Sequence, residues 1–321
     1  MTRFCLLAFA LLVSRGAHSL TLTNCNQSWQ FERIPQRTVV YTHSAYENLA
    51  ALQLTSSIIS VVGYRKEQDG APSPWTQSAE TKIHFDNAPW SGEALLVSQP
   101  DFIYSGSFYW FNSPETPDCH QLDRWGIATW LSESVCYGLQ SKTPTALTFE
   151  GIYTEIRNIA HIYHVQPRAE ALIDSLRRSV TDDAKKAAAL PARQLIWWYS
   201  GLSTPYVAGG YGAPELLTRT VGSENVFKDS EELWPAVSWE VIAARDPDFI
   251  VVGDLRRGGP GDSAADKIAF LESNPFTAGM RAVRQKHYII LPGYDMDPSV
   301  RTIPALSRLV SQLQSFKPQE K

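Results

Sequence analysis

Apolar residues along this chain fall into two kinds of pattern, short continuous runs and longer runs at helical spacing. The runs Thr38–Tyr41, Ile58–Val62 and Gln194–Tyr199 are typical of strands that are covered on both faces. Between residues 149 and 189 the apolar positions instead recur every three or four residues, which predicts two successive helices. Pro167 fits the first turn of the second one. Strands and helices in this order predict an α/β fold with central sheets.

One stretch occurs twice in similar form, at Ser91–Gly106 and at Ser238–Asp254. Aligned without gaps, the copies share Ser, Glu, Pro, Asp, Phe and Ile at equivalent positions. Each copy predicts a short helix capped by its Ser, ended near its Pro and followed by a buried strand. A structural unit used twice predicts two similar lobes.

The length of 321 residues also favours two domains, because it exceeds what one hydrophobic core usually holds. No Gly- or Ser-rich linker separates the halves, whereas a helix of about 22 residues spans roughly 33 Å, enough to join two lobes. We therefore expect an N-terminal α/β lobe at 20–165, a linking helix at 166–190 and a C-terminal α/β lobe at 191–321.

Residues 1–19 read as a secretory signal peptide. Arg3 precedes the apolar run Phe4–Val13, and Ala17-His18-Ser19 offers a cleavage site. We expect export to the periplasm, and Asn24 before Cys25 argues against a lipid anchor. The formal charge of −4 at pH 7 lacks the basic excess that nucleic-acid binding requires.

Three cysteines follow the signal: Cys25, Cys119 and Cys136. In an oxidising compartment they predict one disulfide and one free thiol, with three pairings open. A metal site of three thiolates is the alternative, which the absence of Cys-x-x-Cys spacing disfavours.

The sequence offers no motif for catalysis or metal binding. It lacks a nucleophile elbow, a P-loop, a dinucleotide fingerprint and a His-Glu-x-x-His helix. Among the dispersed histidines only His161 and His164 share a predicted helix face, without a third ligand. The glycines of Gly209–Gly212 would bind an anion before a helix or, as we favour, let the backbone pass closely. We therefore expect no enzyme.

Aromatic residues are abundant, with ten Trp and thirteen Tyr, and many follow predicted strands. Open α/β sheets bind ligands at the carboxyl ends of their strands. The first such loop offers Thr42, His43 and Ser44, the last of which we expect to cap a helix. The alternative is that half of the aromatic residues only pack the core. Our candidate ligand-binding residues are Tyr46, Tyr64, Arg65, Tyr109, Trp110, Trp198, Tyr199, Tyr206, Tyr211, Arg256 and Tyr294.

The second copy of the repeat, Ser238–Val252, closely resembles the second-lobe signature of the periplasmic substrate-binding proteins of ABC importers for ferric siderophores and cobalamin. Pro35–Val40 is similar to the first-strand motif of that family, Gln99–Ile103 to its first-lobe signature and Phe276–Leu291 to its closing helix and strand. The resemblance implies two α/β lobes, a ligand cleft between them and one rigid connecting helix.

The resemblance also implies a function. We expect a monomeric receptor that captures a ferric siderophore and delivers it to an inner-membrane ABC permease, with cobalamin or haem as alternative ligands. Because an iron chelate brings its own coordination shell, the protein needs no cofactor or metal ligands. Arg65, Arg256 and Arg257 would meet an anionic chelate; the alternative is that they are simply solvated. The other classes are an enzyme or cofactor-assembly protein on a similar scaffold, and a receptor that reports to a sensor.

Two further roles follow from the resemblance alone. Glu93 and Glu240 match the paired glutamates that dock such receptors onto permease arginines, one per lobe; the alternative is a helix-start acid in each lobe. One subgroup carries an Asn-Cys near its mature N-terminus, which implies a Cys25–Cys136 disulfide and a free Cys119.

Overall fold

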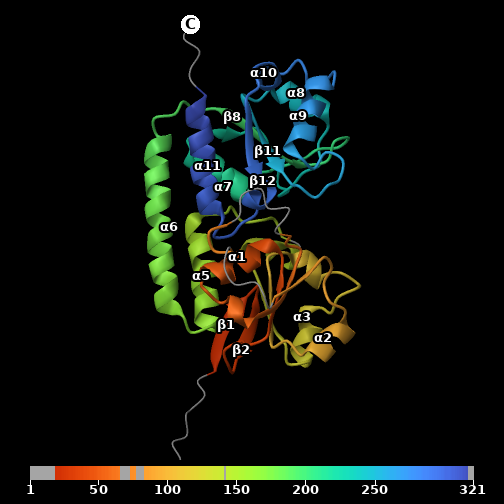
Figure 1. Cartoon of the computed structure of the whole chain (residues 1–321), viewed down its shortest axis with the longest axis vertical. Coiled ribbons are helices and arrows are strands. Elements are labelled where there is room, and N and C mark those ends of the chain that lie inside the picture. Colours follow the sequence, from red (N-terminus) through yellow and green to blue (C-terminus); the bar gives the residue numbers. More distant parts are fainter. Residues whose placement is uncertain (1–18, 66–72, 77–82, 141, 317–321) are drawn as a thin grey trace, which may run out of the picture.

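A computed structural model describes residues 19–65, 73–76, 83–140 and 142–316, so almost all of the expected signal peptide lies outside the described residues. Two α/β lobes are stacked along the long axis of the molecule, and helices α6 (Gln166–Ala187) and α11 (Thr302–Ser315) run along one side (Figure 1). The α/β fold with central sheets is confirmed.

The first lobe holds a five-stranded parallel sheet in the order β5-β4-β3-β6-β7. A separate antiparallel hairpin precedes it. The hairpin strands are β1 (Leu20–Asn24) and β2 (Gln27–Phe31), and the sheet strands are β3 (Thr38–Tyr41), β4 (Ile58–Val62), β5 (His84–Asp86), β6 (Phe102–Ser105) and β7 (Ala128–Leu131). The helices are α1 (His43–Ala51), α2 (Gly92–Ser98), α3 (Cys119–Arg124), α4 (Tyr137–Gln140) and α5 (Phe149–Ile162).

The second lobe repeats this plan with the parallel order β10-β8-β11-β12, and β9 pairs antiparallel with β8. Apolar side chains pack on both faces of its sheet, as the continuous runs predict. The strands are β8 (Gln194–Ser200), β9 (Tyr206–Val207), β10 (Glu224–Asn225), β11 (Phe249–Asp254) and β12 (Tyr288–Pro292). The helices are α7 (Ala213–Thr220), α8 (Trp239–Arg245), α9 (Ala264–Ser273) and α10 (Arg281–Arg284).

The duplicated stretch forms the same structure in both lobes. Ser91 and Ser238 cap α2 and α8 through their side chains, and both helices end at a residue in the left-handed region. The repeated Asp then fixes the neighbouring strand: Asp101 accepts a hydrogen bond from the backbone N–H of Arg37 before β3, and Asp248 accepts one from Gln194 at the start of β8. The predicted pair of helix–strand units is confirmed, and each unit aligns two adjacent strands.

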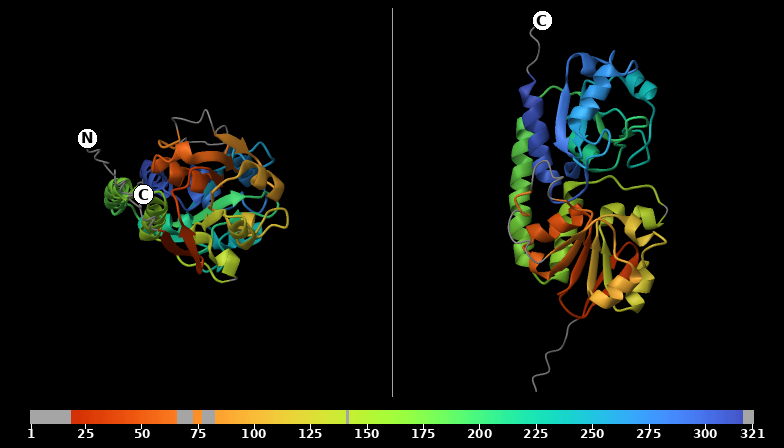
Figure 2. Two further views of the ribbon diagram at one scale, coloured as in Figure 1. Left: turned by 90° about the horizontal axis from the view of Figure 1, so that it is seen from below. Right: turned by 45° about the vertical axis from the view of Figure 1, so that its right-hand side comes forward.

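The linking helix α6 has 22 residues, and Pro167 lies in its first turn, as predicted. It packs against α5 of the first lobe and α11 of the second, so these three helices form a layer alongside both sheets (Figure 2, right). Ser307 of α11 donates a hydrogen bond to Asp183 of α6. The connection between the lobes is therefore helical and is reinforced by the C-terminal helix.

A disulfide joins Cys25, after β1, to Cys136, just beyond β7. Cys119 is a free, half-buried thiol in α3. Burial raises the pKa of its thiol to about 11, so it stays protonated and unreactive at neutral pH.

The predicted cap of α1 is wrong. The helix begins at His43 with Thr42 as its N-cap, and Ser44 lies inside the first turn. Thr42 has φ of 84°, a region that non-glycine residues seldom occupy, and its hydroxyl lies 2.9 Å from that of Ser44. A Cβ atom on Gly106 would lie 2.1 Å from the Ser44 hydroxyl, so the β6 loop must have glycine there to approach α1.

Candidate ligand-binding cleft

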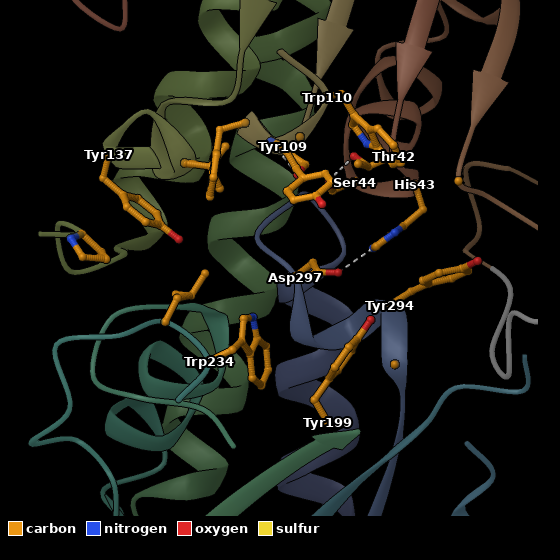
Figure 3. Close-up of a pocket in the computed structure, with 18 of the residues that line it drawn as sticks. Thr42, His43, Ser44, Tyr109, Trp110, Tyr137, Tyr199, Trp234, Tyr294 and Asp297 are labelled. Carbon is orange, nitrogen blue, oxygen red and sulfur yellow. Dashed lines mark hydrogen bonds and ion pairs between the residues drawn. The ribbon is translucent and has the colours of Figure 1, made fainter. Parts of the chain in front are cut away.

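The carboxyl ends of the two sheets face each other across a cleft of about 1000 Å³ (Figure 3). The first lobe contributes the segments that follow β3, β4, β6 and β7. The second contributes the last residues of β8 and β11 and the segments after β11 and β12. A loop of the second lobe at 231–234 completes the wall. The cleft lies where open α/β sheets bind ligands.

Aromatic side chains dominate its surface. Of the predicted candidates, Tyr109, Trp110, Tyr199 and Tyr294 line the cleft, together with Thr42, His43 and Ser44. Tyr109 is 66% exposed, so it offers a ring to a ligand at low desolvation cost. The sequence analysis missed Phe108, Tyr137 and Trp234. Tyr137 lies in the segment after β7, directly after Cys136. The expectation that ligand-binding residues follow strands, which we call the strand-end rule, could therefore have found it.

Seven other candidates lie outside the cleft lining. Trp198 is buried against Trp239 and Phe270 on the opposite face of the sheet from Tyr199, because successive strand residues point to opposite faces. Tyr46 and Tyr64 are buried with ring centroids 5.2 Å apart in the first-lobe core. The remaining four are Arg65, Tyr206, Tyr211 and Arg256.

Each of these four has a local reason for its position. Arg65 is exposed and donates to the Asn87 side chain, and Tyr206 lies on the short edge strand β9 with 45% of its surface exposed. The backbone carbonyl of Tyr211 accepts a hydrogen bond from the backbone N–H of Leu147, which lies just before α5. Arg256 pairs with Asp254 at 2.7 Å, and its neighbour Arg257 faces the cleft in its place.

A histidine and an aspartate from different lobes meet in the cleft. His43 Nε2 lies 3.4 Å from Asp297 Oδ2, and the His43 ring stacks on Tyr294 with centroids 4.0 Å apart (Figure 3). Burial, and to a smaller extent the charge of Arg301, lowers the pKa of His43 to about 3, so its ring is neutral. Burial raises the pKa of Asp297 to about 7. Asp297 lines the cleft, and 32% of its side chain is exposed.

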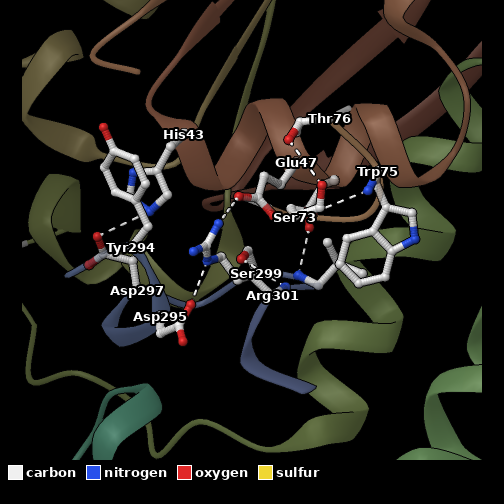
Figure 4. Close-up of polar contacts among 12 residues, drawn as sticks. His43, Glu47, Ser73, Trp75, Thr76, Tyr294, Asp295, Asp297, Ser299 and Arg301 are labelled. Atoms are coloured by element: carbon white, nitrogen blue, oxygen red, sulfur yellow. Dashed lines mark hydrogen bonds and ion pairs between the residues drawn. The ribbon is translucent and has the colours of Figure 1, made fainter. Parts of the chain in front are cut away.

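Behind this pair, a buried ionic network joins the lobes (Figure 4). The Arg301 guanidinium lies 2.8 Å from Glu47 of α1 and also bonds Asp295, and all three side chains are fully buried. Asp295 in turn accepts from Arg308 at 2.6 Å. The network fixes the loop 292–301, which carries Tyr294 and Asp297, against the first lobe.

Glu93 and Glu240 are exposed residues in the first turns of α2 and α8. The two helices lie toward opposite ends of the molecule, both on the side away from α6 (Figure 1). This placement leaves one carboxylate on each lobe accessible to a second protein.

Within the described ranges, no three His, Cys, Asp or Glu side chains gather as a metal site would require. No helix in that part of the chain is both long and apolar enough to cross a membrane.

The sequence profile of a family described as periplasmic binding protein matches residues 39–294. A vitamin B12-binding protein of Pectobacterium atrosepticum is 23% identical over 244 residues, which cover 74% of this chain and 75% of that protein.

Two solved structures share the fold. A periplasmic binding protein from Veillonella parvula has a TM-score of 0.77 at 21% identity, covering 94% of this chain and 99% of its own. An ABC-type Fe3+-hydroxamate transport system from Saccharomonospora viridis has a TM-score of 0.75 at 21% identity, covering 91% and 98%.

Proposed function

Because the chain belongs to the periplasmic binding protein family, we propose that it captures a metal chelate in the periplasm and delivers it to an ABC permease of the inner membrane. A ferric siderophore is the first choice of ligand, and a corrinoid or haem is the alternative. In this role the chain binds and releases its ligand and catalyses no reaction. The Fe3+-hydroxamate system and the vitamin B12-binding protein similar to this chain support this class of ligand.

The observation that carries the proposal is the composition and size of the cleft. Its volume of about 1000 Å³ lies at the upper end of the roughly 300–1000 Å³ that ligand pockets occupy, which favours a large ligand. Tyr109, Trp110, Tyr199, Trp234 and Tyr294 supply broad apolar faces with polar tips. A chelate whose metal is already coordinated needs such walls and requires no metal ligand from the protein.

Titration of the exported protein, purified without its signal peptide, tests the proposal. Trp110 and Trp234 line the cleft, so a ligand there should change the tryptophan fluorescence saturably, with one ligand per protein. The probes are a ferric trihydroxamate, cyanocobalamin and haemin. Replacing Trp234→Phe should reduce the signal change, whereas Trp125→Phe, outside the cleft, should preserve it. Saturable binding of cobalamin or haemin alone would reverse the choice of ligand, and binding of none of the three would overturn the proposal.

The rival class is an enzyme or cofactor-assembly protein on this scaffold. The His43–Asp297 pair is the arrangement closest to an acid–base pair, but the lowered pKa of His43 makes it a weak base at neutral pH.

A second rival is a receptor that only reports to a sensor. Uptake of the labelled chelate by a deletion strain would separate it from an importer component, because only loss of an importer component abolishes uptake.

A further inference from the structure

The charged groups of the cleft are unevenly matched. One lining cation, Arg257, and one lining carboxylate, Asp254, are already neutralised by neighbouring side chains. Arg257 bonds Asp262 at 2.6 Å, and Asp254 bonds Arg256 at 2.7 Å while accepting the backbone N–H of Ala264 at 3.0 Å. Neither of these pairs presents a free charge to a ligand.

The lining groups left without compensation are mainly acidic. Glu231 and Glu232 are exposed at the cleft wall, and among the described residues neither has an ion-pair partner. Lys142 also lines the cleft and has no ion-pair partner among the described residues, and Asp297 adds a carboxyl group that titrates near neutral pH. The balance of these groups is negative, which disfavours a strongly anionic ligand.

The loop that carries the two glutamates is held in place. The backbone N–H of Gly209 donates to Leu233 at 3.0 Å, and that of Gly210 donates to Ser230 at 3.3 Å. A Cβ atom on Gly209 would lie 2.0 Å from the carbonyl oxygen of Glu232, so this approach requires glycine. The glycine cluster therefore positions the acidic loop against the cleft, and the close passage of backbone predicted there is confirmed.

The deeper wall also offers hydrogen-bond acceptors. His43 is 6% exposed and its neutral ring bonds the backbone of Tyr294. Its Nε2 atom lies 3.4 Å from Asp297 Oδ2 but makes no hydrogen bond in the described part of the chain. Beside it lies the carboxyl group of Asp297. A ligand that donates N–H groups would satisfy these atoms, whereas one that presents only anionic oxygens would leave them unpaired.

We propose that the cleft selects metal chelates that carry no net negative charge and that present amide or ammonium N–H donors, with Glu231 and Glu232 as the residues that set this preference. This inference rests on the proposed function and narrows its ligand class. A ferric hydroxamate with amide or ammonium groups and a corrinoid with carboxamide side chains share this chemistry. A ferric catecholate, whose oxygens give the complex a high negative charge, is excluded.

The sharpest test uses two ligands that differ by one charge. The ferric complex of a linear trihydroxamate with a terminal ammonium group is compared with its N-acetylated form, which has the same iron coordination and is neutral. At low salt the cationic form should bind about tenfold more tightly, and added salt should shrink the difference. A ferric tricatecholate, which carries three negative charges, should bind most weakly. Binding of cyanocobalamin, measured beside the two trihydroxamates, tells whether the preferred ligand is a corrinoid or a hydroxamate.

Variants assign the preference to the loop. The Glu231→Gln/Glu232→Gln pair should abolish the advantage of the cationic trihydroxamate while keeping affinity for the neutral form. Glu231→Lys/Glu232→Lys should gain affinity for the tricatecholate. Glu272→Gln, which changes an exposed acid of α9 outside the cleft, is the matched control. It should change neither the preference for the cationic trihydroxamate nor the affinity for the tricatecholate.

Two results would overturn the inference alone: tighter binding of the tricatecholate than of the cationic trihydroxamate, or an unchanged preference in the Gln pair. If no chelate, corrinoid or haemin bound the wild-type protein, the proposed function would fail and the inference with it.

Discussion

The guanidinium of Arg301 lies 2.8 Å from the carboxylate of Glu47, with both side chains fully buried, although 254 positions separate the two residues in the sequence. The pair joins the first helix of the N-terminal lobe to the start of the last helix of the chain. Asp295 bonds the same guanidinium and also bonds Arg308, so Arg301 is the cation that Glu47 and Asp295 share.

Removing that cation should be costly. Arg301→Met removes the cation that Glu47 and Asp295 share and leaves Asp295 with the partly exposed Arg308. Loss of one partner of a buried ion pair typically lowers the free energy of unfolding by about 3–5 kcal/mol. Urea unfolding at neutral pH measures this change. Arg256→Met, which removes an exposed partner of Asp254, is the control and should cost no more than about 1 kcal/mol. A loss as small as that of the control would show that the network contributes little, and Glu47→Gln added to Arg301→Met should recover part of the loss.

Binding of the cationic trihydroxamate should depend on pH through Asp297. Burial raises the pKa of this carboxyl group to about 7, so it is protonated below that pH and negatively charged above it. The titratable groups near it are His43 from α1, at 3.4 Å, and Tyr199 from β8. Among these His43 stays neutral at and above neutral pH, because burial lowers its pKa to about 3.

The sign follows from proton release. A cation favours the ionised form of Asp297, so affinity should rise with pH between about pH 6 and about pH 8, by at most tenfold per pH unit for one proton. Asp297→Asn should remove this dependence, whereas Asp266→Asn on α9 should retain it. Calorimetric titration of each variant at three pH values gives the slopes, and a slope that survives in Asp297→Asn would assign the proton to another group.

Charge reversal on α2 and α8 should block delivery of the ligand. If Glu93 and Glu240 dock on permease arginines, Glu93→Lys/Glu240→Lys should reduce uptake in cells by about tenfold or more while ligand affinity stays nearly unchanged. Glu115→Lys/Glu272→Lys, one exposed acid per lobe at other positions, is the matched control. Normal transport by the Glu93/Glu240 double variant, or loss of ligand binding in it, would mean that these acids only begin helices.

The three cysteines should form one disulfide and leave one thiol that reacts slowly. Peptide mapping of unreduced protein should assign the bridge to Cys25 and Cys136, and Cys119 should react with a thiol reagent mainly after unfolding because it is half-buried with a raised pKa. Cys25→Ser/Cys136→Ser opens a loop of 111 positions and should lower the free energy of unfolding by about 2–4 kcal/mol. A bridge that included Cys119 would contradict this arrangement.

Local patterns predicted the fold well because each element carries its own signal. The duplicated Ser and Asp positions specify a capped helix and an aligned strand, and the apolar spacing after Pro167 specifies α6. The strand-end rule also correctly predicted that Tyr199 and Tyr294 line the cleft. It failed for Trp198 because a strand buried on both faces shows no alternation from which to choose the face.

The electrostatic character of the cleft could not be predicted from sequence in the same way. Glu231 and Glu232 occur in an exposed loop without periodicity, and their position depends on backbone contacts with Gly209 and Gly210. The His43–Asp297 contact likewise joins residues from two lobes. Such features arise only when segments far apart in the sequence pack together. Local patterns therefore pointed to arginines and an anionic chelate, and gave no signal for Glu231 and Glu232.

The buried Glu47–Arg301 pair also constrains the order in which the chain can fold. A ribosome makes the N-terminal half first, yet the core of that lobe includes Val300 and Ile303, and Glu47 meets its cation only when Arg301 has been made. Until then a finished first lobe would hold a buried carboxylate and an open apolar face, both of which disfavour the compact state. We therefore expect the nascent chain to gain little from folding early and to complete its first lobe only after residues 300–303 have been made. A truncation that ends before residue 300 would leave the first lobe incomplete, although every strand of its sheet is present.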